Sequence, residues 1–176
     1  MKITVLAYLD KETKTQFDLA VGHVARALRD GGHTVSVLGV HGNQRKLVNG
    51  LARRRPDLVF NLMEMFGDNL LGAGPVAGLL DLLGYPYTGA GPGEFYLQED
   101  KALTKKLLAF DQILYPDFAV FSKDADLETG GRLKLPLFVK PLRMDASIGI
   151  GAKSLVHSVT DMMRRVLEIH DKVKDS

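Results

Sequence analysis

The sequence contains no cysteine among its 176 residues, which excludes disulfide bonds and thiolate chemistry. It also has little excess charge, since 23 lysine and arginine residues face 21 aspartate and glutamate residues, a formal net charge of +2. This balance argues against a nucleic-acid partner. No apolar run is long enough to cross a bilayer, and the N-terminus lacks a signal-peptide cleavage pattern. We therefore expect no membrane partner and a cytoplasmic location.

The first half of the chain alternates between strand and helix patterns. Hydrophobic residues make up 45% and charged residues 25%, the profile of a globular protein with one large domain or two small ones. Apolar runs and helical spacing predict strands over residues 3–9, 34–40 and 57–62, and helices over residues 19–30 (capped by Asp18) and 44–54. Continuous apolar strands between helices are typical of a parallel sheet covered on both faces.

The second half is less regular. Pro75 suits the first turn of a helix that Gly84 ends, and a short strand is expected over residues 85–88. The glycine-proline turn over residues 89–93 is our expected domain boundary. Further expected elements are a helix opened by Asp100 and Lys101, a strand over 116–121, a surface loop over 123–134, strands over 135–139 and 154–157, and a helix capped by Ser158. The expected fold class is α/β: a doubly wound parallel sheet in residues 1–93, followed by a smaller α+β lobe in residues 94–176.

One motif suggests a phosphate site. Residues 135–141 read LPLFVKP, so a buried apolar strand would deliver Lys140 to its end, and residues 142–151 follow as a loop with a hydroxyl and two glycines. A lysine supplies charge, and free backbone N–H groups can wrap around phosphate oxygens. The alternative is an edge strand with a solvated lysine and an ordinary glycine turn. The motif taken by itself leaves both interpretations open.

The sequence shows no recognisable set of metal ligands and no recognisable catalytic triad. The acidic residues Glu64, Asp68, Glu94 and Asp145 are scattered, and the five histidines show no ligand spacing. We assign no metal site to this chain, and we find no Ser-His-Asp arrangement.

Three segments together resemble the ATP-grasp ligases of the D-alanine–D-alanine ligase type. They are residues 78–89 (GLLDLLGYPYTG), residues 100–105 (DKALTK) and residues 135–149, and their order and separation fit the family. The resemblance covers nearly the whole chain but only about the first half of such an enzyme. It implies a Rossmann-like pre-ATP-grasp domain followed by the first, small lobe of an ATP-grasp domain.

The resemblance also implies site residues. Lys101 and Lys140 would contact the phosphates of ATP or the neighbouring ring edge, while Ser147, Ile148 and Gly149 would belong to the loop that closes over the phosphates. Two lysines from different elements can neutralise a polyphosphate as point charges. For Lys101 the alternative is an exposed residue in the first turn of a helix. The family also uses Mg²⁺, whose ligands we expect beyond Ser176.

The sequence departs from the family on the amino-acid side. Thr13 stands where the family has a substrate-binding Glu, with Glu12 adjacent, and a Met-Glu-Met stretch containing Glu64 replaces a His-Gly. Ala146 and Ser147 replace the usual Ser-Ser of the loop. Glu12, Thr13 and Glu64 are therefore the candidates to bind a small amino-acid-like substrate. These changes favour ATP use over D-alanine use.

The leading hypothesis is the N-terminal half of an ATP-dependent, ADP-forming carboxylate–amine ligase. Such an enzyme makes an amide or peptide bond through an acyl phosphate, and we expect the 176 residues alone to be inactive. One alternative is a non-catalytic α/β module that binds a small molecule. Another is a degenerate paralogue retained for oligomerisation, and a homodimer is left open.

Overall fold

The computed structural model describes residues 1–13, 16–122, 128–130, 133–144 and 147–172. The chain divides into two compact units, Met1–Tyr96 and Leu97–Ser176. The point of division along the chain falls within helix α4 (Pro92–Glu99). The assignment of residues 94–176 to an ATP-grasp lobe stays a prediction. No helix in the described ranges combines the length and apolarity needed to cross a membrane.

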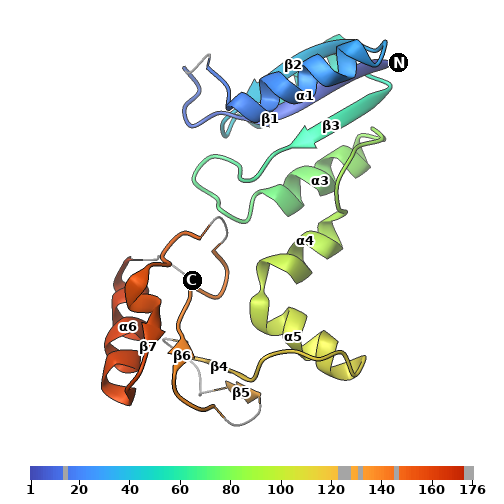
Figure 1. Ribbon diagram of the computed structural model, residues 1–176. Helices are drawn as coiled ribbons and strands as arrows, with labels where there is room; N and C mark the ends of the chain where they lie inside the picture. The colour runs from blue at the N-terminus through green and yellow to red at the C-terminus, as the bar shows by residue number, and fades with distance from the viewer. Residues whose placement is uncertain (14–15, 123–127, 131–132, 145–146, 173–176) are drawn as a thin grey trace. The chain divides into compact units, whose positions relative to one another are not determined.

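Unit 1 is built on a three-stranded parallel sheet (Figure 1). Its strands are β1 (Lys2–Tyr8), β2 (Thr34–Val40) and β3 (Leu58–Leu62), in the order β2-β1-β3. Ile3 lies opposite Val35 on one side and Leu58 on the other, so the central strand pairs in parallel with both neighbours. β1 is buried on both faces, as its unbroken apolar run predicts.

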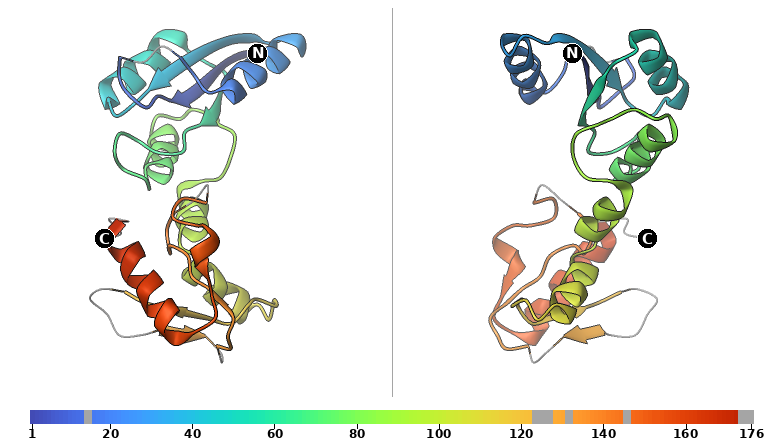
Figure 2. Two further views of the ribbon diagram at one scale, coloured as in Figure 1. Left: turned by 60° about the vertical axis from the view of Figure 1, so that its left-hand side comes forward. Right: turned by 90° about the vertical axis from the view of Figure 1, so that its right-hand side faces the viewer.

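Helices cover both faces of this sheet (Figure 2). On one face, α1 (Leu19–Asp30) packs Val21 and Ala25 against Val5 and Ala7 of β1. On the other face, α2 (Gln44–Arg54) and α3 (Ala73–Leu82) close a cluster that includes Leu6. This two-sided cover confirms the predicted doubly wound α/β class, and β2 and α2 have the predicted bounds.

The segment after α3 differs from the prediction. Residues 85–88 form no strand; Tyr87 makes a single parallel bridge to Val59, whose N–H donates to the Pro86 carbonyl at 2.8 Å. Pro86 has no N–H to extend a ladder, which limits the pairing. The predicted turn over residues 89–93 runs into α4, which Pro92 opens, because proline's fixed φ suits the first helical position.

After the end of α4, the described residues of unit 2 form the helices α5 (Lys101–Phe110) and α6 (Val159–Lys172) and two small antiparallel sheets. Helix α5 precedes β4 (Phe118–Val120), which pairs with β5 (Glu128–Gly130) inside the segment predicted as a surface loop. β6 (Leu137–Phe138) pairs with β7 (Leu155–Val156), and a single 3₁₀ turn, Ala152–Ser154, leads into β7. Helix α6 packs beside β7 (Figure 1). Ser158 caps α6 as predicted, since its hydroxyl accepts from the Asp161 N–H at 3.1 Å.

The lysine-bearing strand is shorter and more exposed than its sequence suggests. The prediction of a buried strand over residues 135–139 is wrong, because β6 has two residues and Phe138 is 55% exposed. One further bond, from the Val139 N–H to the Ser154 carbonyl at 2.8 Å, holds the end of this segment. Lys140 therefore follows a half-exposed, two-residue strand.

Candidate functional site

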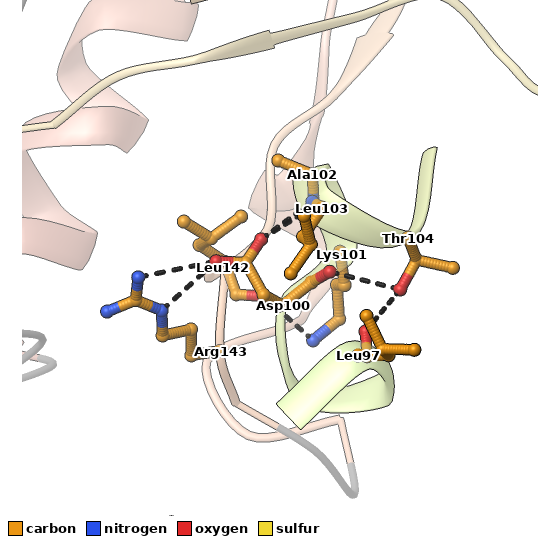
Figure 3. Close-up of polar contacts among 8 residues, drawn as sticks. All are labelled: Leu97, Asp100, Lys101, Ala102, Leu103, Thr104, Leu142 and Arg143. Carbon is orange, nitrogen blue, oxygen red and sulfur yellow. Dashed lines mark hydrogen bonds and ion pairs between the residues drawn. The ribbon is translucent and has the colours of Figure 1, made fainter. Parts of the chain in front are cut away.

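The start of α5 is fixed by Asp100. One carboxylate oxygen, Oδ1, accepts from the backbone N–H groups of Ala102 at 3.0 Å and Leu103 at 2.9 Å, which satisfies two donors of the first turn (Figure 3). The hydroxyl of Thr104 adds bonds to the carbonyls of Asp100 and Leu97. The cap sets the position of Lys101 because that residue is the first of the helix.

Lys101 and Asp100 both contact the segment that follows β6 (Figure 3). The ammonium group of Lys101 donates to the carbonyls of Leu142 at 3.2 Å and Met144 at 2.7 Å. The second carboxylate oxygen of Asp100 accepts from Nε and Nη2 of Arg143, each at 3.3 Å. These contacts join the N-terminus of α5 to the chain that leads into the glycine loop.

A cavity of about 580 Å³ lies beside these contacts and within unit 2. Lys101 and Lys105 of α5 line it, together with Lys140 after β6 and the Phe118 ring of β4. The structure therefore brings the two sequence-predicted lysines to one cavity. Lys105 joins them. The sequence analysis gave this residue no role, although it is the last residue of the DKALTK segment and lies one helical turn after Lys101.

The lysines that line the cavity give its wall a positive charge. Burial lowers the pKa of Lys105 below its ordinary value of 10.5, and the charge of Lys140 lowers it further. The ammonium of Lys105 lies 5.0 Å from the centre of the Phe118 ring, within the range of a cation–π contact. Such surroundings favour binding of an anion, which would offset the repulsion between the lysines.

The predicted phosphate-covering loop forms a tight turn. Ser147 and Gly149 both have positive φ, 60° and 73°, and the N–H of Ile150 donates to the Ser147 carbonyl at 3.0 Å. Ser147 and Ile148 are exposed. Ala146, the predicted departure from the family's loop, lies outside the described residues. The exposed turn leaves Ser147, Ile148 and Gly149 accessible to a ligand.

Arg165 of α6 anchors the far end of this loop. Its side chain is only 11% exposed, and its Nη2 donates to the Gly149 carbonyl and, at 3.4 Å, to the hydroxyl of Ser154. Its Nη1 donates to Glu168 at 3.0 Å, so the guanidinium bridges α6, the glycine loop and the turn before β7. Sequence reasoning missed this residue because an arginine on a helix carries no sign of a long-range partner.

The substrate-side candidates lie in unit 1 in different surroundings. Glu12 accepts from the N–H groups of Gly42 at 3.2 Å and Asn43 at 3.0 Å, and it pairs with Lys46 at 3.0 Å, all around the N-terminus of α2. These bonds, led by the one from Lys46, lower the pKa of Glu12. Thr13 is exposed in the adjacent turn. The carboxylate of Glu12 thus already has hydrogen-bond and ion-pair partners at the start of α2.

Glu64 lines a separate cavity of about 690 Å³. The cavity lies at the carboxyl ends of β1 and β3, and Tyr8, Asp10 and Asn61 contribute to its wall together with the start of α1. Ligands of open parallel sheets bind outside this edge. Among the residues that the structure describes, no group of three or more His, Asp or Glu side chains is placed to hold a metal ion.

Curated proteins similar to this chain are named D-alanine–D-alanine ligase. The Aquifex aeolicus (strain VF5) protein is 30% identical over 176 residues, which cover 99% of this chain and 57% of that protein. The Paramagnetospirillum magneticum (strain ATCC 700264 / AMB-1) protein is 34% identical over 127 residues, covering 72% of this chain and 40% of the relative. No family model matches the chain.

Solved structures show the same fold. A Bacillus anthracis D-alanine–D-alanine ligase complexed with ATP aligns over 97% of this chain and 55% of its own, with a TM-score of 0.66 and 17% identity. A second structure of the Bacillus anthracis ligase aligns over 97% of this chain and 54% of its own, with a TM-score of 0.70.

The fold and the curated relatives together point to the ATP-grasp ligases. The chain is similar to ligases of the D-alanine–D-alanine type over 99% of its own length, and it shares the fold of their solved structures over 97%. It spans about half the length of the curated relatives that it matches. The family resemblance of the three sequence segments is confirmed.

Proposed function

We propose that this chain supplies the amino-terminal domain and the first nucleotide-binding lobe of an ATP-dependent, ADP-forming carboxylate–amine ligase. The observation that carries the proposal is that Lys101, Lys105 and Lys140 line one and the same cavity of unit 2. A solved relative that shares the fold is complexed with ATP. Lysines on separate elements suit a polyphosphate, because each can approach a different oxygen as a point charge.

The proposed reaction has two steps. The γ-phosphoryl group of ATP passes to a substrate carboxylate, giving ADP and an acyl phosphate; an amine then attacks the acyl carbon, releasing phosphate and a proton. In this scheme the residues of this chain act by charge and position rather than as nucleophiles. Lys101 and Lys140 neutralise the phosphates, and Ser147, Ile148 and Gly149 cover them.

Asp100, Arg143 and Arg165 have an indirect role in this scheme. Asp100 and Arg143 hold the chain that enters the glycine loop, and Arg165 holds the Gly149 carbonyl at its exit. A loop fixed at both roots loses less conformational freedom when it closes over a ligand, which favours binding. Mg²⁺ would add charge between the phosphates, with ligands from outside the described residues.

The amino-acid side is proposed to lie at the carboxyl edge of the sheet in unit 1. There Glu64 offers a carboxylate to the amino group of a small amino-acid-like substrate. Glu12 supports the loop by its bonds to α2, and the exposed Thr13 contacts the substrate. Because Thr13 replaces an acidic residue of the family, we propose that D-alanine is not the preferred substrate.

Calorimetry with ATP and Mg²⁺, followed by an ADP-release assay with a panel of amino acids, tests the proposal. We expect the 176-residue chain to bind ATP without amino-acid-dependent turnover, since it spans about half the length of its relatives. Absence of ATP binding would contradict the proposed function. Binding of a small molecule but not of nucleotide would favour the non-catalytic module, for which the cavity of unit 1 provides a site.

A further inference from the structure

Lys105 lies one helical turn beyond Lys101 on α5, and both residues line the cavity of unit 2. The side chain of Lys105 is half-buried, and the Phe118 ring flanks its ammonium group. Within the described residues, that ammonium makes no hydrogen bond and no ion pair. A half-buried ammonium gives up part of its hydration, and an anionic ligand in the cavity would offset that cost.

The charges around the cavity are unbalanced. Among the residues that the structure describes, four lysines and one carboxylate, that of Asp117, line it. The lysines are Lys101, Lys105, Lys134 and Lys140. Burial and the charge of Lys140 both lower the pKa of Lys105, so the free cavity keeps this cation in an unfavourable place. A bound polyanion would relieve the repulsion.

We infer that Lys105 is a third cation for the phosphate chain of the nucleotide, acting alongside Lys101 and Lys140. The inference rests on the proposed nucleotide site and extends it. Lys101 already donates to the carbonyls of Leu142 and Met144, whereas the donors of Lys105 are unused within the described residues. Contact with a neutral base alone would leave the repulsion between Lys105 and Lys140 in place, so the phosphates are the better partner.

The test compares Lys105→Gln, Lys105→Arg and Lys106→Gln in the 176-residue chain. Lys106 is a matched control because it is the next residue of α5, is exposed and does not line the cavity. Calorimetry gives the affinity of each variant for adenosine, AMP, ADP and ATP. We expect Lys105→Gln to weaken ATP binding roughly tenfold or more, the scale of a charge-assisted contact. The loss should shrink through ADP and AMP and vanish for adenosine.

The other two variants show whether the charge of Lys105, rather than the substitution itself, accounts for the loss of affinity. Lys105→Arg should keep most of the affinity because it keeps the charge, and Lys106→Gln should stay within about twofold of wild type. The melting temperature of free Lys105→Gln should be no lower than that of Lys106→Gln, because the substitution removes a half-buried charge beside Lys140. A purely structural role for Lys105 predicts the opposite shift.

Three results would overturn the inference. The first is an equal loss of adenosine and ATP affinity in Lys105→Gln, which would indicate a base contact. The second is the same small effect in Lys105→Gln and Lys106→Gln while wild type binds ATP, which would remove Lys105 alone from the site. The third is a wild-type chain that binds none of the four ligands, which would overturn the proposed function and this extension together.

Discussion

The carboxylate of Asp100 joins two distant parts of unit 2, because one oxygen caps α5 and the other accepts from Arg143 at 3.3 Å. The two residues are 43 positions apart in the chain. Lys101 follows the cap directly, and its ammonium bonds to the carbonyls on either side of Arg143. The helix start and the root of the glycine loop therefore form one hydrogen-bonded unit (Figure 3).

Replacing Asp100 should destabilise unit 2. Asp100→Ala removes the cap and the partner of Arg143, and we expect a loss of about 1–2 kcal/mol in the free energy of unfolding. Asp100→Asn keeps a cap acceptor and should lose less. Urea unfolding followed by circular dichroism measures both. Asp111→Ala, at the other end of α5, is the control, since the backbone of Asp111 closes that end; an equal loss there would contradict the prediction.

Removing Lys140 should weaken nucleotide binding. We expect Lys140→Ala to reduce ATP affinity by roughly 1.5–3 kcal/mol, because a charged contact to phosphate is lost from the cavity. Calorimetry on the folded variant measures the change, with Lys2→Ala in β1 as a control for overall charge. Unchanged ATP affinity in folded Lys140→Ala would remove this residue from the site.

Glu12 should contribute a pH-dependent part of the stability. Its bonds to Lys46, Gly42 and Asn43 hold its folded-state pKa below the ordinary 4.5. Between the two values the unfolded chain binds more protons, so this contribution is present above pH 4.5 and is lost as the pH falls through the lowered pKa.

The measurement compares unfolding midpoints of wild type and Glu12→Gln over roughly pH 2.5 to 6. The difference between them should be largest at the upper end of this range and should narrow on acidification. Lys46→Met should behave in the same way, because it removes the leading partner of the carboxylate. A difference that is constant with pH would argue against the role of this ion pair.

D-alanine should be a poor ligand of the chain. Thr13 offers a hydroxyl where the family has a carboxylate, and a site built on a charged hydrogen bond loses strongly when that partner is absent. In a thermal-shift assay with millimolar amino acids, we expect D-alanine to raise the melting temperature less than the best amino acid of the panel. Thr13→Glu should enlarge the D-alanine shift. A dominant D-alanine response in wild type, or efficient D-alanyl-D-alanine synthesis, would refute the prediction.

Local signals were enough to predict much of unit 1. The side chain of Asp18 accepts from the N–H of Ala20 at 2.7 Å to open α1, and Gly31 closes it, as the sequence indicates. Bounds of β2 and α2 match because apolar spacing, caps and breakers act within a few residues of one another. The family resemblance likewise depends on short segments and their order, and the similar proteins confirm it.

Unit 2 was harder to predict because its strands depend on distant partners. The segment before Lys140 has a strand's composition, yet β6 keeps two residues, as its pairing is limited to the equally short β7. Residues 85–88 fail to form a strand for a related reason, since one bridge to Val59 is their only recorded pairing in the described chain. Whether a segment forms a strand depends on the neighbouring strand with which it pairs, and the composition of the segment alone does not specify that neighbour.

The sequence by itself determined the parallel α/β class and the resemblance to ATP-grasp ligases, and it singled out Lys101 and Lys140 as candidates, because periodicity, caps and short motifs are local. Only the tertiary structure decided that Lys105 joins Lys101 and Lys140 at one cavity, that Arg143 returns to Asp100 and that Arg165 holds Gly149. The physical reason is that charge repulsion and hydrogen bonding depend on distance in space, and the fold brings these groups together from elements far apart in the chain.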